Sequence, residues 1–228
     1  IYTAAALAVM ATFLVIVFGQ RGFVDRIYKK SHFIDGLHVL RKNKVLRRIT
    51  LLNFMLQVYF VVMVIYSPVY LTSVIGFSWK TLGIILSVML LPFVIFPRGA
   101  GKLADRFGEK RLMYLGLGIM AVATIVFANL GFAPAAIYAL VLFVTRSGAS
   151  ILETMCDSAF FKHVTDTDSA VISTYRTMMP VAYTVGPLIA GLIFALYSYK
   201  VLFLSIGIVM ALSLLIVARI KGHHKRVI

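Results

Sequence analysis

The apolar stretch 134–160 carries one stripe of polar side chains that could do chemistry. The stripe begins at Arg146, and its other members follow 4, 7 and 11 residues later: Ser150, Glu153 and Asp157. At about 100° per residue in a helix, these offsets place the last three within about 40° of the direction of Arg146. A charge at membrane depth costs about 2.5–3.5 kcal/mol or more, so the stripe should face a cavity or a partner. The spacing therefore predicts a solute or proton site on one helix face.

The charged members of the stripe each have two interpretations. Arg146 could bind an anionic solute, or it could only neutralise Glu153, which lies about 10.5 Å further along the helix. A carboxyl group in a low-dielectric environment can bind and release a proton near neutral pH, so Glu153 is a candidate for proton coupling. Asp157 lies closer to the end of the stretch. There we expect a structural salt bridge to loop cations.

Two other apolar stretches carry polar groups that could line the same cavity. They contribute Asn53, Gln57, Tyr66 and Tyr183. Asn53 and Gln57 are four residues apart and share one helix face. Amphipathic tyrosines suit ligands of mixed polarity, although tyrosines are also common at membrane interfaces.

Enzyme chemistry has little support in the sequence. All five histidines fall in loops or in the tail, and Cys156 has no visible nucleophilic partner. No glycine-rich phosphate loop is present, so ATP-driven transport is not supported. We expect no cofactor and no metal site.

The elements that position these groups are membrane helices. The chain of 228 residues is 61% hydrophobic with a mean hydropathy of +0.96, well above a soluble domain. A helix of about 20 apolar residues spans the hydrocarbon core, where every backbone polar group must be paired. Seven stretches qualify: 1–18, 49–75, 81–97, 112–131, 134–160, 171–196 and 200–218. The prediction is an all-α membrane protein, a helical bundle of seven transmembrane spans.

The cations alternate between connections, which accounts for most of the net charge of +15. They are dense in a loop over 19–48, between 98 and 111, and in the tail 219–228, and sparse in the turns between. This distribution follows the positive-inside rule and predicts a cytoplasmic C-terminus. It argues against nucleic acid as a partner. Whether the loop 19–48 contacts anionic lipid or is a solvated connector stays open at this point.

A charged motif, expected to be a loop, connects the spans 81–97 and 112–131. Its defined positions are Gly101, Leu103, Asp105, Arg106, Gly108, Lys110 and Arg111. This pattern resembles the loop signature of the major facilitator superfamily, G-x-L-x-D-R-x-G-x-[RK]-[RK], at every defined position. In that family the signature lies between the second and third helices of a six-helix half. The motif here lies between the second and third spans of the block 49–218.

The resemblance implies that 49–218 is the C-terminal half of a twelve-helix transporter. Residues 1–18 then resemble the end of the sixth helix, and 19–48 the central cytoplasmic loop, so the chain looks like a fragment without its N-terminal half. In this family the motif aspartate engages a helix end of the opposite half, which makes Asp105 a gate residue. A further stretch resembles the glycine-proline motif of the fifth helix of the half, with tight helix packing as its simpler explanation: Gly186, Pro187 and Gly191.

These observations predict a secondary transporter that moves a small solute by alternating access, with proton coupling as an open possibility. The expected partners are the lipid bilayer, a small-molecule substrate and the missing N-terminal half. The expected location is a plasma membrane, such as a bacterial inner membrane. Two alternatives remain: a non-transporting receptor or scaffold on the same fold, and a membrane-embedded enzyme.

Overall fold

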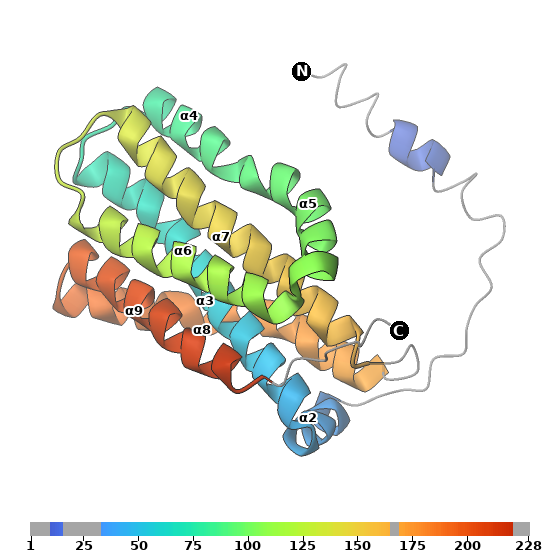
Figure 1. Ribbon diagram of the computed structural model, residues 1–228. Helices are drawn as coiled ribbons and strands as arrows, with labels where there is room; N and C mark the ends of the chain where they lie inside the picture. The colour runs from blue at the N-terminus through green and yellow to red at the C-terminus, as the bar shows by residue number, and fades with distance from the viewer. Residues whose placement is uncertain (1–9, 16–32, 165–168, 221–228) are drawn as a thin grey trace. The chain divides into compact units, whose positions relative to one another are not determined.

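The computed structural model of the chain describes residues 10–15, 33–164 and 169–220. Apart from the short connections, these residues are helical and contain no strand, which confirms the all-α class. Six stretches within them are long and apolar enough to cross a membrane, and they correspond to six of the seven predicted spans. Figure 1 shows the helices, which are α2 (Phe33–Lys42), α3 (Lys44–Ser73), α4 (Trp79–Leu90), α5 (Pro92–Phe107), α6 (Glu109–Asn129), α7 (Ala135–Phe161), α8 (Ser169–Leu196) and α9 (Tyr199–Ala218).

The chain divides into two units, Ile1–Lys30 and Ser31–Ile228. The predicted span 1–18 belongs to the first unit, and residues 10–15 of it are described as helical. The rest of that span, residues 19–32 of the predicted loop 19–48, and the tail beyond residue 220 lie outside the described residues. Helices α2 to α9 all belong to the second unit.

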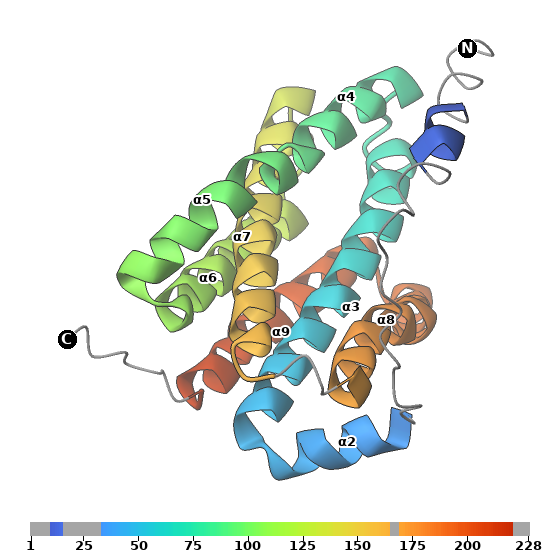
Figure 2. The same ribbon diagram turned by 90° about the vertical axis from the view of Figure 1, so that its right-hand side faces the viewer.

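The predicted loop 19–48 contains helix where it is described. It includes all of α2, and α3 begins at Lys44 rather than at residue 49. Asn43 separates the two helices as the N-cap of α3, because its side-chain oxygen accepts two backbone N–H hydrogen bonds at 3.0 and 3.2 Å. In Figure 2, α2 lies across the ends of α3 and α8, with both of which it is in contact. α2 is only ten residues long and ends in two cations, Arg41 and Lys42, so a search for long apolar runs misses it.

The predicted span 81–97 and the predicted loop that follows also differ from the structure. Pro92 has no N–H to donate, and the N–H of Leu91 bonds to the carbonyl of Val88 at 3.2 Å, so the helix is interrupted between α4 and α5. α5 then continues to Phe107 and takes in most of the charged motif. The only residue between α5 and α6 is Gly108, whose φ of 84° suits glycine. The motif is therefore helical on both sides of Gly108. Its charges are tolerated there because long charged side chains can reach water from the end of a helix.

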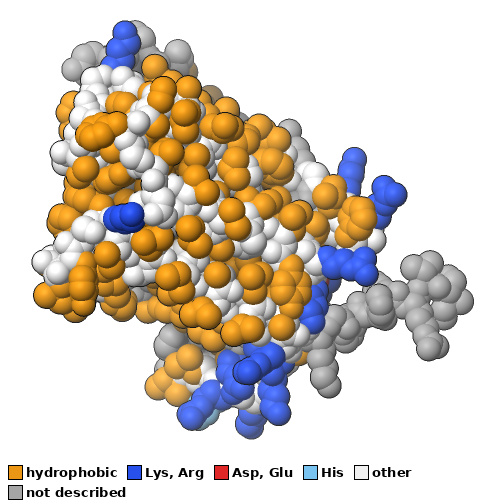
Figure 3. Space-filling model, turned by 60° about the vertical axis from the view of Figure 1, so that its left-hand side comes forward, with side chains coloured by type: hydrophobic (Ala, Val, Ile, Leu, Met, Phe, Trp, Pro, Cys, Tyr) orange, Lys and Arg blue, Asp and Glu red, His pale blue; other side chains and the backbone are white. Residues whose placement is uncertain are grey.

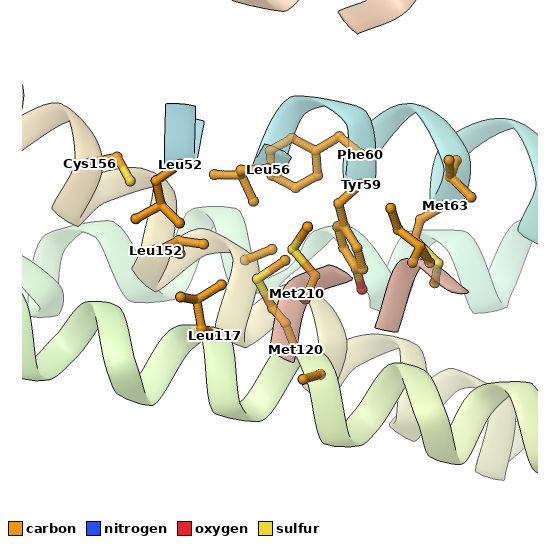
Figure 4. Close-up of a cluster of buried hydrophobic side chains, with 14 of the residues drawn as sticks. Leu52, Leu56, Tyr59, Phe60, Met63, Leu117, Met120, Leu152, Cys156 and Met210 are labelled. Carbon is orange, nitrogen blue, oxygen red and sulfur yellow. The ribbon is translucent and has the colours of Figure 1, made fainter. Parts of the chain in front are cut away.

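α6 and α7 are in close contact through two glycines. A Cβ atom on Gly148 would lie 2.6 Å from the carbonyl oxygen of Gly116, and one on Gly116 would lie 2.8 Å from the carbonyl oxygen of Gly148. Small residues of this kind allow membrane helices to approach closely. α6 also packs on α9, and α3 packs on α7, α8 and α9. Figure 4 shows part of the apolar core between these helices, including Leu52, Leu56, Met63, Leu117, Met120, Leu152 and Met210.

The two ends of the bundle differ in chemistry. Aromatic side chains are exposed near the turns that follow α3, α6 and α8: Trp79, Phe132 and Tyr197. Trp and Tyr favour the membrane–water interface. The other ends of the helices carry most of the cations. In Figure 3, most of the Lys and Arg side chains lie along the lower and right-hand edge of an otherwise apolar face. We call these two ends the aromatic end and the basic end.

Candidate functional site

Arg146 is enclosed near the middle of α7 with little to neutralise its charge. Only 2% of the residue is exposed, and its Nε and Nη2 atoms have no hydrogen-bond partner. Within the described residues, no carboxylate forms an ion pair with Arg146 at 4.0 Å or less. A buried charge without a partner is costly, and at membrane depth it marks a functional position by default.

The guanidinium of Arg146 instead lies over an aromatic ring of α3. Its Cζ atom is 5.3 Å from the centre of the Phe60 ring, within the range of a cation–π contact. Phe60 in turn meets Phe93 of α5 edge-on, with 5.7 Å between the ring centroids. The sequence analysis missed both rings, because a phenylalanine in an apolar span carries no signal that separates it from its neighbours. The surroundings of Arg146 are thus built by α3, α5 and α7.

Three polar side chains lie close enough to interact electrostatically with Arg146. They come from α3, α7 and α8: Tyr59, Glu153 and Tyr183. Tyr59 is fully buried, and its hydroxyl is paired with the hydroxyl of Thr124 at 3.0 Å. Tyr183 is 40% exposed. The structure therefore brings two of the predicted cavity residues, Glu153 and Tyr183, to the neighbourhood of Arg146.

Ser150 has a structural contact in place of an open position. It is 1% exposed, and its hydroxyl donates a hydrogen bond to the carbonyl of Pro92 at 3.3 Å. Pro92 is the first residue of α5, directly after the break in the helix. Ser150 thus ties α7 to the break between α4 and α5.

The stripe on α7 becomes more exposed toward the basic end. Glu153 is half-buried and Asp157 is exposed. Asp157 Oδ1 accepts a 2.8 Å hydrogen bond from the hydroxyl of Tyr175 on α8. The partner that the structure gives Asp157 is therefore a hydroxyl group, whereas the sequence predicts a loop cation.

The polar residues predicted on α3 have partners of their own. Asn53 and Gln57 are buried, and the Gln57 amide donates to Asn53 Oδ1 at 3.4 Å. Tyr66 is half-buried, and its hydroxyl donates to the carbonyl of Pro187 on α8 at 3.1 Å. These contacts join polar groups within α3 and between α3 and α8.

The glycine-proline motif lies where α8 packs on α3. A Cβ atom on Gly186 would lie 3.2 Å from Cγ1 of Val61, and one on Gly191 would lie 3.3 Å from the Tyr66 hydroxyl. Both distances are tighter than ordinary van der Waals contact. The arrangement fits the simpler explanation of this motif, tight helix packing.

The charged motif contributes contacts at the basic end. Lys110 Nζ donates to the carbonyls of Ala218 (3.0 Å) and Ile220 (2.7 Å), and so caps the C-terminal end of α9. Arg106 lies over the ring of Phe107, with Cζ 5.4 Å from its centre. Three further motif residues are exposed: Gly101, Leu103 and Arg111. The side chain of Asp105 lies outside the described part of the structure, so its gate role stays a prediction.

Glu109 is a functional candidate that the sequence analysis missed. Its carboxylate forms a 2.8 Å ion pair with Lys162 and accepts a hydrogen bond from the Ser158 hydroxyl. The motif leaves this position undefined, but Glu109 is the acidic residue in the first turn of α6, where a carboxylate is favoured. It ties the start of α6 to the end of α7.

Comparison with known proteins gives one result. The family model described as Major Facilitator Superfamily matches residues 1–167, well over half of the chain. No curated protein matches the sequence. The described part of the chain has six stretches able to span a membrane, and the charged motif joins the second of them to the third, in line with that match. The chain therefore belongs to the Major Facilitator Superfamily.

Proposed function

We propose that this major facilitator chain provides the C-terminal half of a secondary transporter, with residues 49–218 as its six-helix unit. The observation that carries the proposal is Arg146, a charge enclosed near the middle of α7 whose Nε and Nη2 atoms lack partners. An ionisable residue at this depth usually belongs to a substrate or ion pathway. We infer that a small solute passes close to Arg146, Glu153 and Tyr183 by alternating access.

The proposal includes an orientation and a partner half. The positive-inside rule assigns the basic end to the cytoplasm. We place the N-terminal half against α8 and the span Trp79–Pro97, because only 17% and 22% of their apolar windows are buried, compared with 61% in α3. Asp105, near the basic end, would then act at the joint between the halves.

Glu153 is the proposed proton carrier, since it is half-buried and lies close to Arg146. Replacing Glu153 by glutamine should abolish pH-driven solute flux and leave solute exchange in place, because glutamine keeps the shape but cannot bind or release a proton. The measurement uses the full-length transporter in vesicles with an imposed pH gradient and a defined panel of sugars, amino acids and organic acids.

Asp157→Asn is the matched control for Glu153→Gln. Asp157 lies one turn further along the same stripe, but it is exposed and bonded to Tyr175. This variant should retain pH-driven flux. Unchanged coupling together with unchanged solute affinity in Glu153→Gln would rule out the proton role. Saturable solute binding without flux in the wild type would instead favour a receptor or scaffold.

A further inference from the structure

One edge of the Arg146 guanidinium is left without partners inside the bundle. Within the described residues, its Nε and Nη2 atoms are both buried and lack a hydrogen-bond partner. The N–H groups of these two atoms point in the same direction from a planar group, and together they form an edge that can hold a carboxylate by two parallel hydrogen bonds. The free donors of Arg146 therefore have the arrangement that a carboxylate ligand requires.

The face of the guanidinium is already occupied, which leaves the edge as the place for a ligand. Phe60 of α3 lies against this face, with 5.3 Å between Cζ and the ring centre. Phe93 of α5 meets Phe60 edge-on. An aromatic ring attracts the cation through its quadrupole, but it offers no carboxylate oxygen to the two edge donors. The rings add apolar surface beside the guanidinium, which suits a solute with an apolar body.

The charge balance around Arg146 favours a ligand with one negative charge. Its electrostatic neighbours among the described residues are Tyr59, Tyr183 and Glu153, with no second cation among them. Glu153 lies two turns away and forms no ion pair with Arg146 at 4.0 Å or less. Once Glu153 carries a proton, one guanidinium balances one carboxylate, whereas a phosphate ester would bring two negative charges into a low-dielectric site.

Tyr183 connects the surroundings of Arg146 to an exposed face of the unit. It interacts electrostatically with Arg146 and is 40% exposed on α8, the helix against which the N-terminal half is proposed to lie. The two edge nitrogens are themselves shielded from solvent, so a solute reaches them only when the helices around them move apart. An occluded site of this kind is expected in a protein that works by alternating access.

We propose that Arg146 binds, through Nε and Nη2, the carboxylate of a monocarboxylate solute with a small apolar or aromatic body. This inference rests on the proposed function, since it names the class of solute that the transporter carries. A neutral sugar is a poorer ligand, because its hydroxyl groups would leave the guanidinium charge unbalanced at membrane depth. An organic cation would be repelled by Arg146.

The test measures ligand binding to the purified full-length transporter through the rise in its unfolding temperature over a concentration series. The ligands are acetate, butyrate, benzoate and phenylacetate, each compared with its amide, which keeps the shape and lacks the charge. At least one acid should bind saturably, and its amide should bind at least about thirtyfold more weakly. Equal binding of every acid and its amide, or no binding of any acid, would overturn the proposal. Tighter binding of phenyl phosphate than of benzoate would overturn it in favour of a phosphate ligand.

Arg146→Lys separates the paired donors from the charge. Lysine keeps the positive charge but lacks the planar edge of the guanidinium, so acid binding should weaken about tenfold. Arg146→Met should abolish it. Arg176→Lys is the matched control, because Arg176 is an exposed arginine of α8, and it should bind the acid like the wild type. Full acid affinity in Arg146→Met would place the anion site elsewhere and so overturn the proposal.

These binding measurements do not depend on transport. Saturable acid binding without flux in vesicles would keep the carboxylate site and remove the transport proposal. Flux of a neutral solute, together with equal binding of acids and amides, would do the reverse.

Discussion

Replacing Arg146 by methionine is expected to abolish solute transport and, at the same time, to stabilise the folded protein. The guanidinium is buried with two unpartnered nitrogen atoms, and burial of an uncompensated charge is unfavourable. Methionine is flexible and apolar, so it can occupy the space beside Phe60 without that cost. Apolar replacements of buried charged groups have stabilised proteins by about 1–4 kcal/mol, and we expect a gain in that range.

The functional loss should be large, because a charged contact to a solute inside the membrane would disappear. Loss of a buried charged partner costs about 2–5 kcal/mol, which corresponds to a reduction of about 30- to 5000-fold in flux or affinity. The measurements are thermal unfolding of the purified full-length protein and solute flux in vesicles. Gain of stability with loss of function is the pattern of a site kept for activity.

Arg176→Met is the control for Arg146→Met. Arg176 is an exposed arginine of α8 near the basic end, so its replacement should change the free energy of unfolding little. If Arg146→Met instead lost stability together with transport, Arg146 would be a structural residue. That result would also remove the observation on which the proposed solute pathway depends.

Replacing Gly148 by alanine is expected to separate α6 from α7. The new Cβ atom would lie 2.6 Å from the carbonyl oxygen of Gly116 and 2.9 Å from the backbone nitrogen of Met120. Both neighbours are backbone atoms of a helix, so the contact can be relieved only by moving α6 as a whole. We expect a loss of about 3 kcal/mol, at the upper end for overpacking, seen as a lower unfolding temperature and less monodisperse protein.

Gly118→Ala tests whether that loss comes from the clash. Gly118 lies on α6 two residues after Gly116, but a Cβ atom there meets no atom within 4 Å. Alanine is the better helix former by about 1 kcal/mol, so this variant should be neutral or slightly stabilised. Equal stability of Gly148→Ala and the wild type would show that the two backbones are further apart than described.

The sequence alone determined the class of the protein and the approximate positions of its membrane helices. Apolar length and the side on which cations lie are local properties, because each span must satisfy the bilayer by itself. The charged motif likewise sufficed to indicate the family that the family model then showed. The spacing of Arg146, Glu153 and their neighbours placed a polar stripe on one helix before any packing was known.

The tertiary structure alone decided which partners the polar groups have. Hydropathy gave no sign that Phe60 would lie under Arg146, or that Glu109 would pair with Lys162. It also hid the continuation of α5 through the charged motif, because a search for apolar runs stops at the first cations. Such contacts depend on how each helix is rotated and where it crosses its neighbours. Packing at small residues such as Gly116 and Gly148 determines the rotation and the crossing point of each helix. The apolar length of a span determines neither of these.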